Sequence, residues 1–113
     1  MREAIQVPYS TGRQVPELVV PELTCDTHCH IFDPVRFPYK PEDTRNQPPA
    51  TVDVYRLLQR RLGIRRCVVV TPSAYGTDNR CTLDAVKQLG ADARAVVVLK
   101  EDVSRQELRD FHE

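Results

Sequence analysis

Residues 67–99 read CVVVTPSAYGTDNRCTLDAVKQLGADARAVVVL and contain two apolar, β-branched runs on either side of a helical pattern. The runs Cys67–Val70 and Ala95–Leu99 are typical of strands that are buried on both faces. The segment Thr82–Leu89, closed by Gly90, is expected to form a helix between them. Two such strands joined through a helix indicate a parallel pair with a crossover connection.

The same alternation of strand and helix patterns extends in both directions along the chain. Residues 51–62 predict a helix because Thr51 is a good N-cap and apolar side chains recur on one helical face. Leu23–Thr27 is expected to form a first strand, and Ser104 with Glu107 forms the capping box S-x-x-E of a third helix. The order β-α-β-α-β-α predicts an α/β fold with a parallel sheet, either doubly wound or a (β/α) barrel.

The prolines divide the chain, since eight of the nine lie in residues 1–49. Residues 1–22 are expected to form an irregular N-terminal arm, and residues 23–113 to form one partial barrel domain. Residues 31–50 predict a long proline-rich loop, and loops of this length inside a compact domain are usually functional or disordered. A complete (β/α)8 barrel takes about 250 residues, so the three βα units are expected to be an incomplete, N-terminal piece of one.

Charge and composition exclude several classes of partner. Sixteen Lys+Arg balance sixteen Asp+Glu among 113 residues, whereas a nucleic-acid or anionic-membrane partner needs a basic surplus. No apolar run approaches the ~20 residues of a membrane span, and the N-terminal residues lack the apolar core of a signal peptide. We therefore expect a cytoplasmic protein. The four cysteines form no C-x-x-C pair and are expected to be free thiols.

Two histidines come directly after the first strand candidate, in the sequence Asp26-Thr27-His28-Cys29-His30. Because strand side chains alternate, His28 and His30 are expected on one side, with Asp26 beside them. The carboxyl end of a parallel strand is where barrel enzymes place their active sites. Two imidazoles there can bind a divalent metal or hold a substrate carbonyl. The alternative is a pair of surface or packed histidines that bind nothing.

The loop after the second strand candidate, residues 71–80, gathers hydroxyl, amide, carboxylate and guanidinium groups. Such a loop can bind carboxylates or sugar hydroxyls. Its candidate binding residues are Ser73, Tyr75, Thr77, Asp78 and Asn79. Asp78 or Asn79 equally suits a helix cap, so the sequence leaves capping and binding open. Tyr39 is a candidate for the mouth of a pocket, although such a residue more often anchors its own loop by packing.

Three motifs resemble the amidohydrolase superfamily: CDTHCHIFDP (residues 25–34), FPY (37–39) and VVVTPSAYGTDNRCTLDAV (68–86). The resemblance is to the amidohydrolase-related group, which contains 2-pyrone-4,6-dicarboxylate hydrolase and other lactone hydrolases. It implies a distorted (β/α)8 barrel, of which this chain holds the first three βα units. The S-x-x-G-T-D-N loop is the more specific motif, because the whole superfamily shares the H-x-H pair.

The resemblance also implies roles for single residues. His28 and His30 are implied to be catalytic, either as ligands of one divalent metal ion, zinc or manganese, or as substrate-binding groups of an enzyme without a metal. Ser73 matches a substrate-contacting position. The surrounding motif is matched by Tyr75, Thr77, Asp78 and Asn79. The water-activating aspartate and the arginines that bind substrate carboxylates are expected beyond Glu113.

We therefore expect a hydrolase that opens a carboxylated lactone by attack of water on its carbonyl. His28 and His30 would polarise that carbonyl, and Ser73 would hold a carboxylate or hydroxyl of the substrate. Two alternatives stay open: a non-catalytic, carboxylate-binding remnant or partner half of a barrel, and a metal-dependent amidohydrolase or decarboxylase. The expected partner is a small molecule, with no nucleic acid and no membrane, and no pattern indicates an oligomeric state.

Overall fold

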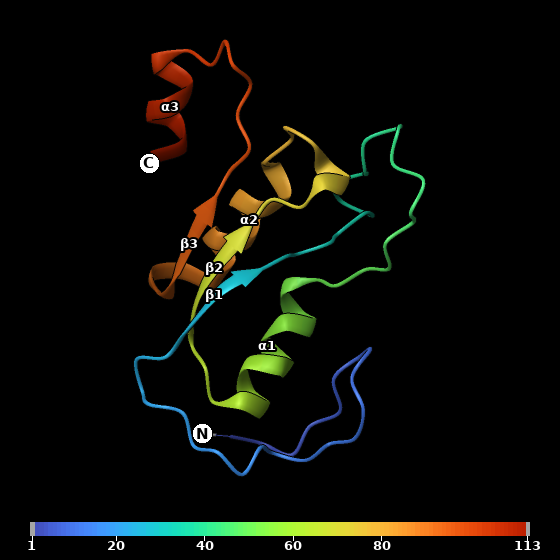
Figure 1. Ribbon diagram of the computed structural model, residues 1–113, viewed down its shortest axis with the longest axis vertical. Helices are drawn as coiled ribbons and strands as arrows, with labels where there is room; N and C mark the ends of the chain where they lie inside the picture. The colour runs from blue at the N-terminus through green and yellow to red at the C-terminus, as the bar shows by residue number, and fades with distance from the viewer. Residues whose placement is uncertain (1, 113) are drawn as a thin grey trace.

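The structure is a computed structural model that describes residues 2–112, and its centre is a small parallel sheet (Figure 1). The strands are β1 (Cys25–Cys29), β2 (Arg66–Val70) and β3 (Ala93–Val96), in the order β1-β2-β3. The helices are α1 (Val52–Leu62), α2 (Arg80–Leu89) and α3 (Arg105–His112), with short 3₁₀ turns at Ser73–Tyr75 and Gly90–Asp92. Both strand pairs are parallel, which confirms an α/β fold with a parallel sheet built from consecutive βα units.

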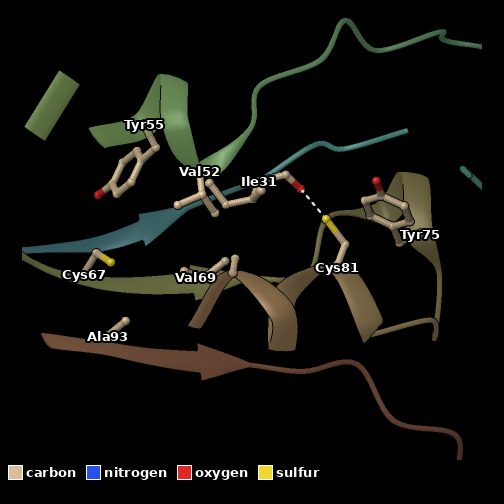
Figure 2. Packing of buried hydrophobic residues seen from close by; sticks show 9 residues of the cluster. Ile31, Val52, Tyr55, Cys67, Val69, Tyr75, Cys81 and Ala93 are labelled. Carbon is tan, nitrogen blue, oxygen red and sulfur yellow. Dashed lines mark hydrogen bonds between the residues drawn. The ribbon is translucent and has the colours of Figure 1, made fainter. Parts of the chain in front are cut away.

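The helices α1 and α2 cover one side of the sheet, and the core lies between them and the strands (Figure 2). Val69 of β2 is 0% exposed and sits at the centre of this cluster. The helix α1 ends as the sequence predicts, because Gly63 adopts a left-handed conformation (φ 77°) and its N–H bonds to the carbonyl of Gln59. Fully burying side chains of this kind stabilises the fold by about 1.5–3 kcal/mol each.

The strand β1 contains an irregularity beside the histidines. Asp26 pairs with Cys67, but Cys29 pairs with Val69, so three steps along β1 lie opposite two steps along β2. Such a bulge re-aims the side chains that follow it. The expectation that Asp26 lies beside the two histidines is therefore wrong: its Oδ2 turns toward α1 and accepts a hydrogen bond from the Tyr55 hydroxyl at 2.8 Å.

The strand β3 differs most from its predicted position, because it covers Ala93–Val96 instead of Ala95–Leu99. Its partner β2 ends at Val70, and the last ladder bond runs from the Thr71 N–H to the Val96 carbonyl (3.0 Å). Pro72 has no N–H to continue the ladder. The predicted burial on both faces is also wrong here, since Val96 is 49% and Leu99 is 41% exposed.

The other boundaries shift by a few residues. The first strand lies at Cys25–Cys29 instead of Leu23–Thr27, so His28 is part of the strand itself. The helix α2 begins two residues before the predicted start, at Arg80. The capping box of α3 is confirmed, since the Glu107 N–H donates to Ser104 Oγ (3.1 Å) and the Ser104 N–H donates to Glu107 Oε2 (2.7 Å). Figure 1 shows α3 beyond the end of β3, apart from the sheet.

The N-terminal segment has no helix or strand between residue 2 and the start of β1, and it is held against the end of α1. The guanidinium of Arg61 donates hydrogen bonds to the backbone carbonyls of Thr11, Gly12 and Gln14. All four cysteines are free thiols. Among residues 2–112, no helix combines the length and the apolar composition needed to cross a membrane.

Candidate active site

The two histidines lie together at the carboxyl end of β1. The rings of His28 and His30 are 5.1 Å apart between centroids and stand at 90° to one another. Both residues are exposed, whereas Cys29 between them points the other way and packs against the core. The prediction that the two imidazoles share one side of the strand is therefore confirmed, with Cys29 on the opposite side as strand alternation requires.

The orientation of His30 is fixed by the neighbouring strand. Its Nδ1 lies 2.8 Å from the carbonyl oxygen of Val70, the last residue of β2. A carbonyl oxygen only accepts hydrogen bonds, so Nδ1 carries the proton of this bond. In the neutral ring, Nε2 is then left with its lone pair available to a ligand. Histidines that bind metals are commonly held in this way, with the other ring nitrogen donating to a carbonyl or carboxylate.

Beside His30 lies a small cavity of about 170 Å³ that joins the first and second βα loops. It is lined by His30, Phe32, Arg45, Gln47, Pro72, Ser73 and Ala74. Ser73 is exposed, and its Oγ accepts a hydrogen bond of 2.9 Å from Nη2 of Arg45. The structure thus brings the predicted residues His30 and Ser73 to one cavity.

Arg45 is the residue that the sequence analysis missed. It belongs to the proline-rich loop and pairs with Asp43, whose side chain is 1% exposed. The guanidinium holds the pKa of the Asp43 carboxyl below its usual value. No local motif marks Arg45, since its contact with Ser73 spans 28 residues of sequence. The length of the loop was the one signal that pointed to this region.

Tyr39 anchors the loop that carries it. Its hydroxyl donates to the carbonyl of Gln47 at 2.8 Å. Its ring packs edge-on against Phe32 and against Tyr75, with centroid distances of 6.2 and 5.2 Å. This arrangement favours the packing interpretation of Tyr39, and through Gln47 it supports one wall of the cavity.

Tyr75 lies in the core, at 2% exposure (Figure 2). Its hydroxyl oxygen accepts a hydrogen bond from the Asp33 N–H at 3.1 Å, so it ties the start of the first loop to the second. Burial raises the pKa of the Tyr75 phenol, which keeps the hydroxyl protonated. The structure therefore places Tyr75 beneath the site and out of reach of a ligand in the cavity.

Asn79 is also buried, and its side-chain amide is fully hydrogen-bonded. Its Oδ1 accepts from the Thr71 hydroxyl (2.8 Å) and from the Val98 N–H (2.9 Å). Its Nδ2 donates to the carbonyls of Val98 (2.9 Å) and Thr77 (3.2 Å). With no donor or acceptor to spare, Asn79 joins the ends of β2 and β3 instead of facing a ligand.

Asp78 and Thr77 lie on the outer part of the same loop. Asp78 accepts from the Arg80 N–H (3.2 Å) at the start of α2 and pairs with the Arg80 guanidinium (2.9 Å). This hydrogen bonding lowers the pKa of the Asp78 carboxyl, and it favours the capping interpretation. Thr77 is exposed and lines a different cavity, with Val98 and Leu99. The binding roles of Thr77 and Asp78 stay predictions.

The donor set for a metal is incomplete in the part of the chain that the structure describes. No three His, Cys, Asp or Glu residues within residues 2–112 are grouped so that they hold a metal ion. Catalytic zinc sites use three protein ligands, and Asp26 is turned toward Tyr55. Metal ligation by His28 and His30 therefore stays a prediction, and it would need at least one more protein donor.

The chain is similar in sequence to two curated hydrolases. The chain is 36% identical over 99 residues to 2-pyrone-4,6-dicarboxylate hydrolase from Comamonas testosteroni, covering 87% of this chain and 32% of that protein. It is 37% identical over 104 residues to 4-sulfomuconolactone hydrolase from Rhizobium radiobacter, covering 88% of this chain and 34% of that protein. The chain thus spans about a third of the length of the curated relatives it matches.

Solved structures show the same fold. An Agrobacterium tumefaciens protein in its apo form superposes with a TM-score of 0.78 at 26% identity, over 88% of this chain and 35% of that one. A candidate 2-pyrone-4,6-dicarboxylic acid hydrolase from Acinetobacter baumannii, solved with citric acid bound, superposes with a TM-score of 0.69 at 27% identity, over 78% and 33%. The sequence profile of the amidohydrolase family matches residues 25–113. Because this match covers most of the chain, the chain belongs to the amidohydrolase family.

Proposed function

We propose that this chain carries the histidine and hydroxyl part of an active site that hydrolyses a carboxylated lactone. The observation that supports this most strongly is the pairing of His28 and His30 at the end of β1, next to the cavity that holds Ser73 and Arg45. Two relatives that are more than a third identical are lactone hydrolases by name. Both named substrates combine a lactone ring with an acidic group.

The chemistry assigns different tasks to the groups of the site. Ser73 and its neighbours hold an acidic group of the substrate and fix its orientation. The imidazoles of His28 and His30 polarise the lactone carbonyl as water attacks it. Nδ1 of His30 donates its proton to the Val70 carbonyl, so only Nε2 faces the substrate. In the neutral ring Nε2 has no proton and accepts a hydrogen bond. His30 therefore donates to an oxyanion from Nε2 only in its imidazolium form.

Activation of water requires a general base. Asp26, the carboxylate nearest to the histidines in sequence, does not suit this step, since Oδ1 accepts from the His28 N–H (3.2 Å) and Oδ2 accepts from Tyr55. We assign the general base and the remaining substrate-binding arginines to residues of the complete active site outside residues 2–112.

A second candidate is a metal-dependent amidohydrolase or decarboxylase. The orientation of His30 favours it, because a neutral ring with Nε2 outward is a ready metal ligand. His28 and His30 would hold a divalent ion together with a donor from elsewhere, and the ion would supply Lewis-acid polarisation of a carbonyl. Metal analysis of the purified protein separates the candidates, since one equivalent of zinc or manganese supports this one.

The test uses the protein encoded by the complete reading frame that contains these 113 residues. Ring opening of 2-pyrone-4,6-dicarboxylate and of 4-sulfomuconolactone is followed by absorbance. We expect hydrolysis of at least one of them, and His28→Ala and His30→Ala are expected to lower kcat/KM by about 100- to 1000-fold. His112→Ala, on the exposed face of α3, is the matched control. Unchanged turnover in both site variants, or no hydrolysis of either lactone, contradicts the proposal.

A further inference from the structure

Arg45 is the one lysine or arginine among the described residues that line the cavity beside His30. We propose that Arg45 determines substrate specificity by binding an anionic group, carboxylate or sulfonate, that sits on the substrate next to the scissile lactone. This inference rests on the proposed function and deepens it, because it states which residue binds the anionic group of the substrate. It also makes neutral lactones poor substrates.

The hydrogen bonds of Arg45 leave part of its guanidinium available. Nε and Nη2 both donate to the carboxylate of Asp43, and Nη2 also donates to Ser73 Oγ. Among residues 2–112, Nη1 has no partner, and the side chain is 51% exposed. Since guanidinium is planar and always charged, it presents Nη1 in a fixed direction once its other two nitrogens are held.

Ser73 adds a second donor at the same place. Its Oγ accepts from Arg45, and a hydroxyl that accepts one hydrogen bond still has its own O–H to donate. Within residues 2–112 this O–H donates no hydrogen bond. A carboxylate or sulfonate has at least two acceptor oxygens, so it can bind the Ser73 O–H and the Arg45 Nη1–H together. Such charge-assisted pairs are stronger than neutral ones.

Asp43 is the obvious objection, because its negative charge offsets that of Arg45. Its carboxylate is 1% exposed and accepts the Arg45 backbone N–H as well as Nε and Nη2. Asp43 therefore faces the guanidinium and not the open cavity, and it holds the group in one orientation before a ligand arrives. Preorganisation of this kind lowers the entropy cost of binding. Lys40, on the same loop, supplies a further positive charge near Asp43.

A purely structural role for Arg45, ordering its loop through Asp43, makes a different prediction. The chain offers a matched control in Arg36, which lies in the same loop, is 50% exposed and pairs with Asp84 of α2 through two hydrogen bonds of 2.8 and 2.9 Å. Arg36 tethers the loop to α2, but it does not line the cavity. Loss of either tether disturbs the loop, whereas only Arg45 is expected to bind an anion.

The binding test uses the protein encoded by the complete reading frame that contains these residues, with citrate, a tricarboxylate, as the anion and its uncharged triethyl ester as the neutral probe. Chemical shifts of the ¹⁵N-labelled protein report both binding and folding. Arg45→Gln is expected to weaken citrate binding by about tenfold or more, the value of one charged hydrogen bond, and Arg36→Gln by less than about twofold. Arg45→Lys keeps the positive charge but lacks the planar guanidinium with its several donors, so its loss of citrate affinity is expected to lie between those of the other two variants. Equal losses in Arg45→Gln and Arg36→Gln, or no binding of citrate to the unaltered chain, overturn the inference.

A kinetic arm separates this inference from the proposed function. In the complete enzyme, Arg45→Gln is expected to raise KM for the dicarboxylate lactone while leaving kcat/KM for a lactone without an acidic group near its original value. If neither lactone is hydrolysed but citrate binding still depends on Arg45, the hydrolase proposal fails and anion recognition stands. If hydrolysis occurs and the variant lowers kcat/KM equally for both lactones, the specificity role fails and the hydrolase proposal stands.

Discussion

The two loops that follow β1 and β2 differ in what their polar groups do. In the loop after β2, the side chains of Thr71 and Asn79 are buried and hydrogen-bonded to one another. In the longer loop after β1, Arg45 is half exposed and keeps a nitrogen without a partner among residues 2–112. One antiparallel bridge, Phe32 with Ala50, closes the base of that longer loop. Apart from Ser73, the loop after β2 is a scaffold, and the loop after β1 carries a group that is ready to bind.

This difference indicates how to separate positioning residues from ligand-binding residues in the site. A buried amide whose donors and acceptors are all satisfied contributes stability and order but has nothing to offer a ligand, as Asn79 shows. His30 and Ser73 each make one fixed hydrogen bond and keep one group available. Asn79 and Ser73 are both polar residues of the same loop, so the sequence alone does not tell a positioning residue from a ligand-binding one. Their hydrogen-bond partners in the structure make that distinction.

The largest effect that tests this comparison is expected at Tyr75. Tyr75→Ala removes a ring that is 2% exposed and packs against Tyr39, and truncating a buried aromatic side chain costs about 3–5 kcal/mol. Tyr75→Phe keeps the ring and loses only the hydrogen bond from the Asp33 N–H, which costs about 1 kcal/mol. Urea-induced unfolding measures both free energies.

The contrast between the two Tyr75 variants also tests its role in binding. Because the hydroxyl lies beneath the cavity, Tyr75→Phe is expected to bind citrate as the unaltered chain does. A tenfold weaker affinity in Tyr75→Phe, with stability largely retained, would place the hydroxyl in the binding site and contradict its assignment to the scaffold.

A smaller loss of stability is expected at Asn79. Asn79→Ala leaves the Val98 N–H and the carbonyls of Val98 and Thr77 without the Asn79 amide, whereas the Thr71 hydroxyl keeps its hydrogen bond with Thr82. Polar groups left unpaired in this way cost about 2–3 kcal/mol in total. Thr77→Ala, two residues away and exposed, is the control and is expected to change stability by less than about 0.5 kcal/mol. Similar unfolding temperatures of the two variants would mean that the hydrogen bonds of the Asn79 amide contribute nothing to the stability of the fold.

Local patterns predicted much of this fold, because many of its determinants are short-range. The end of α1 at Gly63 depends on one left-handed residue, and the start of α3 depends on Ser104 and Glu107, three residues apart. The shared side of His28 and His30 follows from strand alternation, which holds over two residues.

The features that the sequence did not predict all depend on distant partners. The bulge that turns Asp26 away from the histidines exists only in the pairing of β1 with β2. The shift of β3 to Ala93–Val96 is imposed by where β2 stops. Arg45 reaches the site because the long loop folds back on Ser73, and no pattern within the loop encodes that contact. Packing against other parts of the chain overrides local propensity in these cases.

The smallest expected effect compares the ion pairs of the two loops in acid. Arg36 lowers the pKa of the Asp84 carboxyl below its usual 3.8, and Arg80 does the same for Asp78. A carboxyl whose folded pKa is lowered contributes stability that is fully present above the unfolded pKa and is lost as pH falls through the folded pKa. The free energy of unfolding is therefore expected to decrease as pH falls below about 4.

The two ion pairs join different parts of the chain. The Asp84 pair joins the first loop to α2, whereas the Asp78 pair stays within its own loop and the start of α2. Asp84→Asn is accordingly expected to flatten the pH dependence of the free energy of unfolding and to broaden the amide NMR signals of residues 33–37. Asp78→Asn is expected to flatten the same pH dependence but to leave those signals sharp. Both pairs are partly exposed, so added salt should weaken each effect. Urea unfolding at pH 6 and at about pH 3 measures the slopes, and an unaltered slope in both variants would show that these pairs do not couple proton binding to folding.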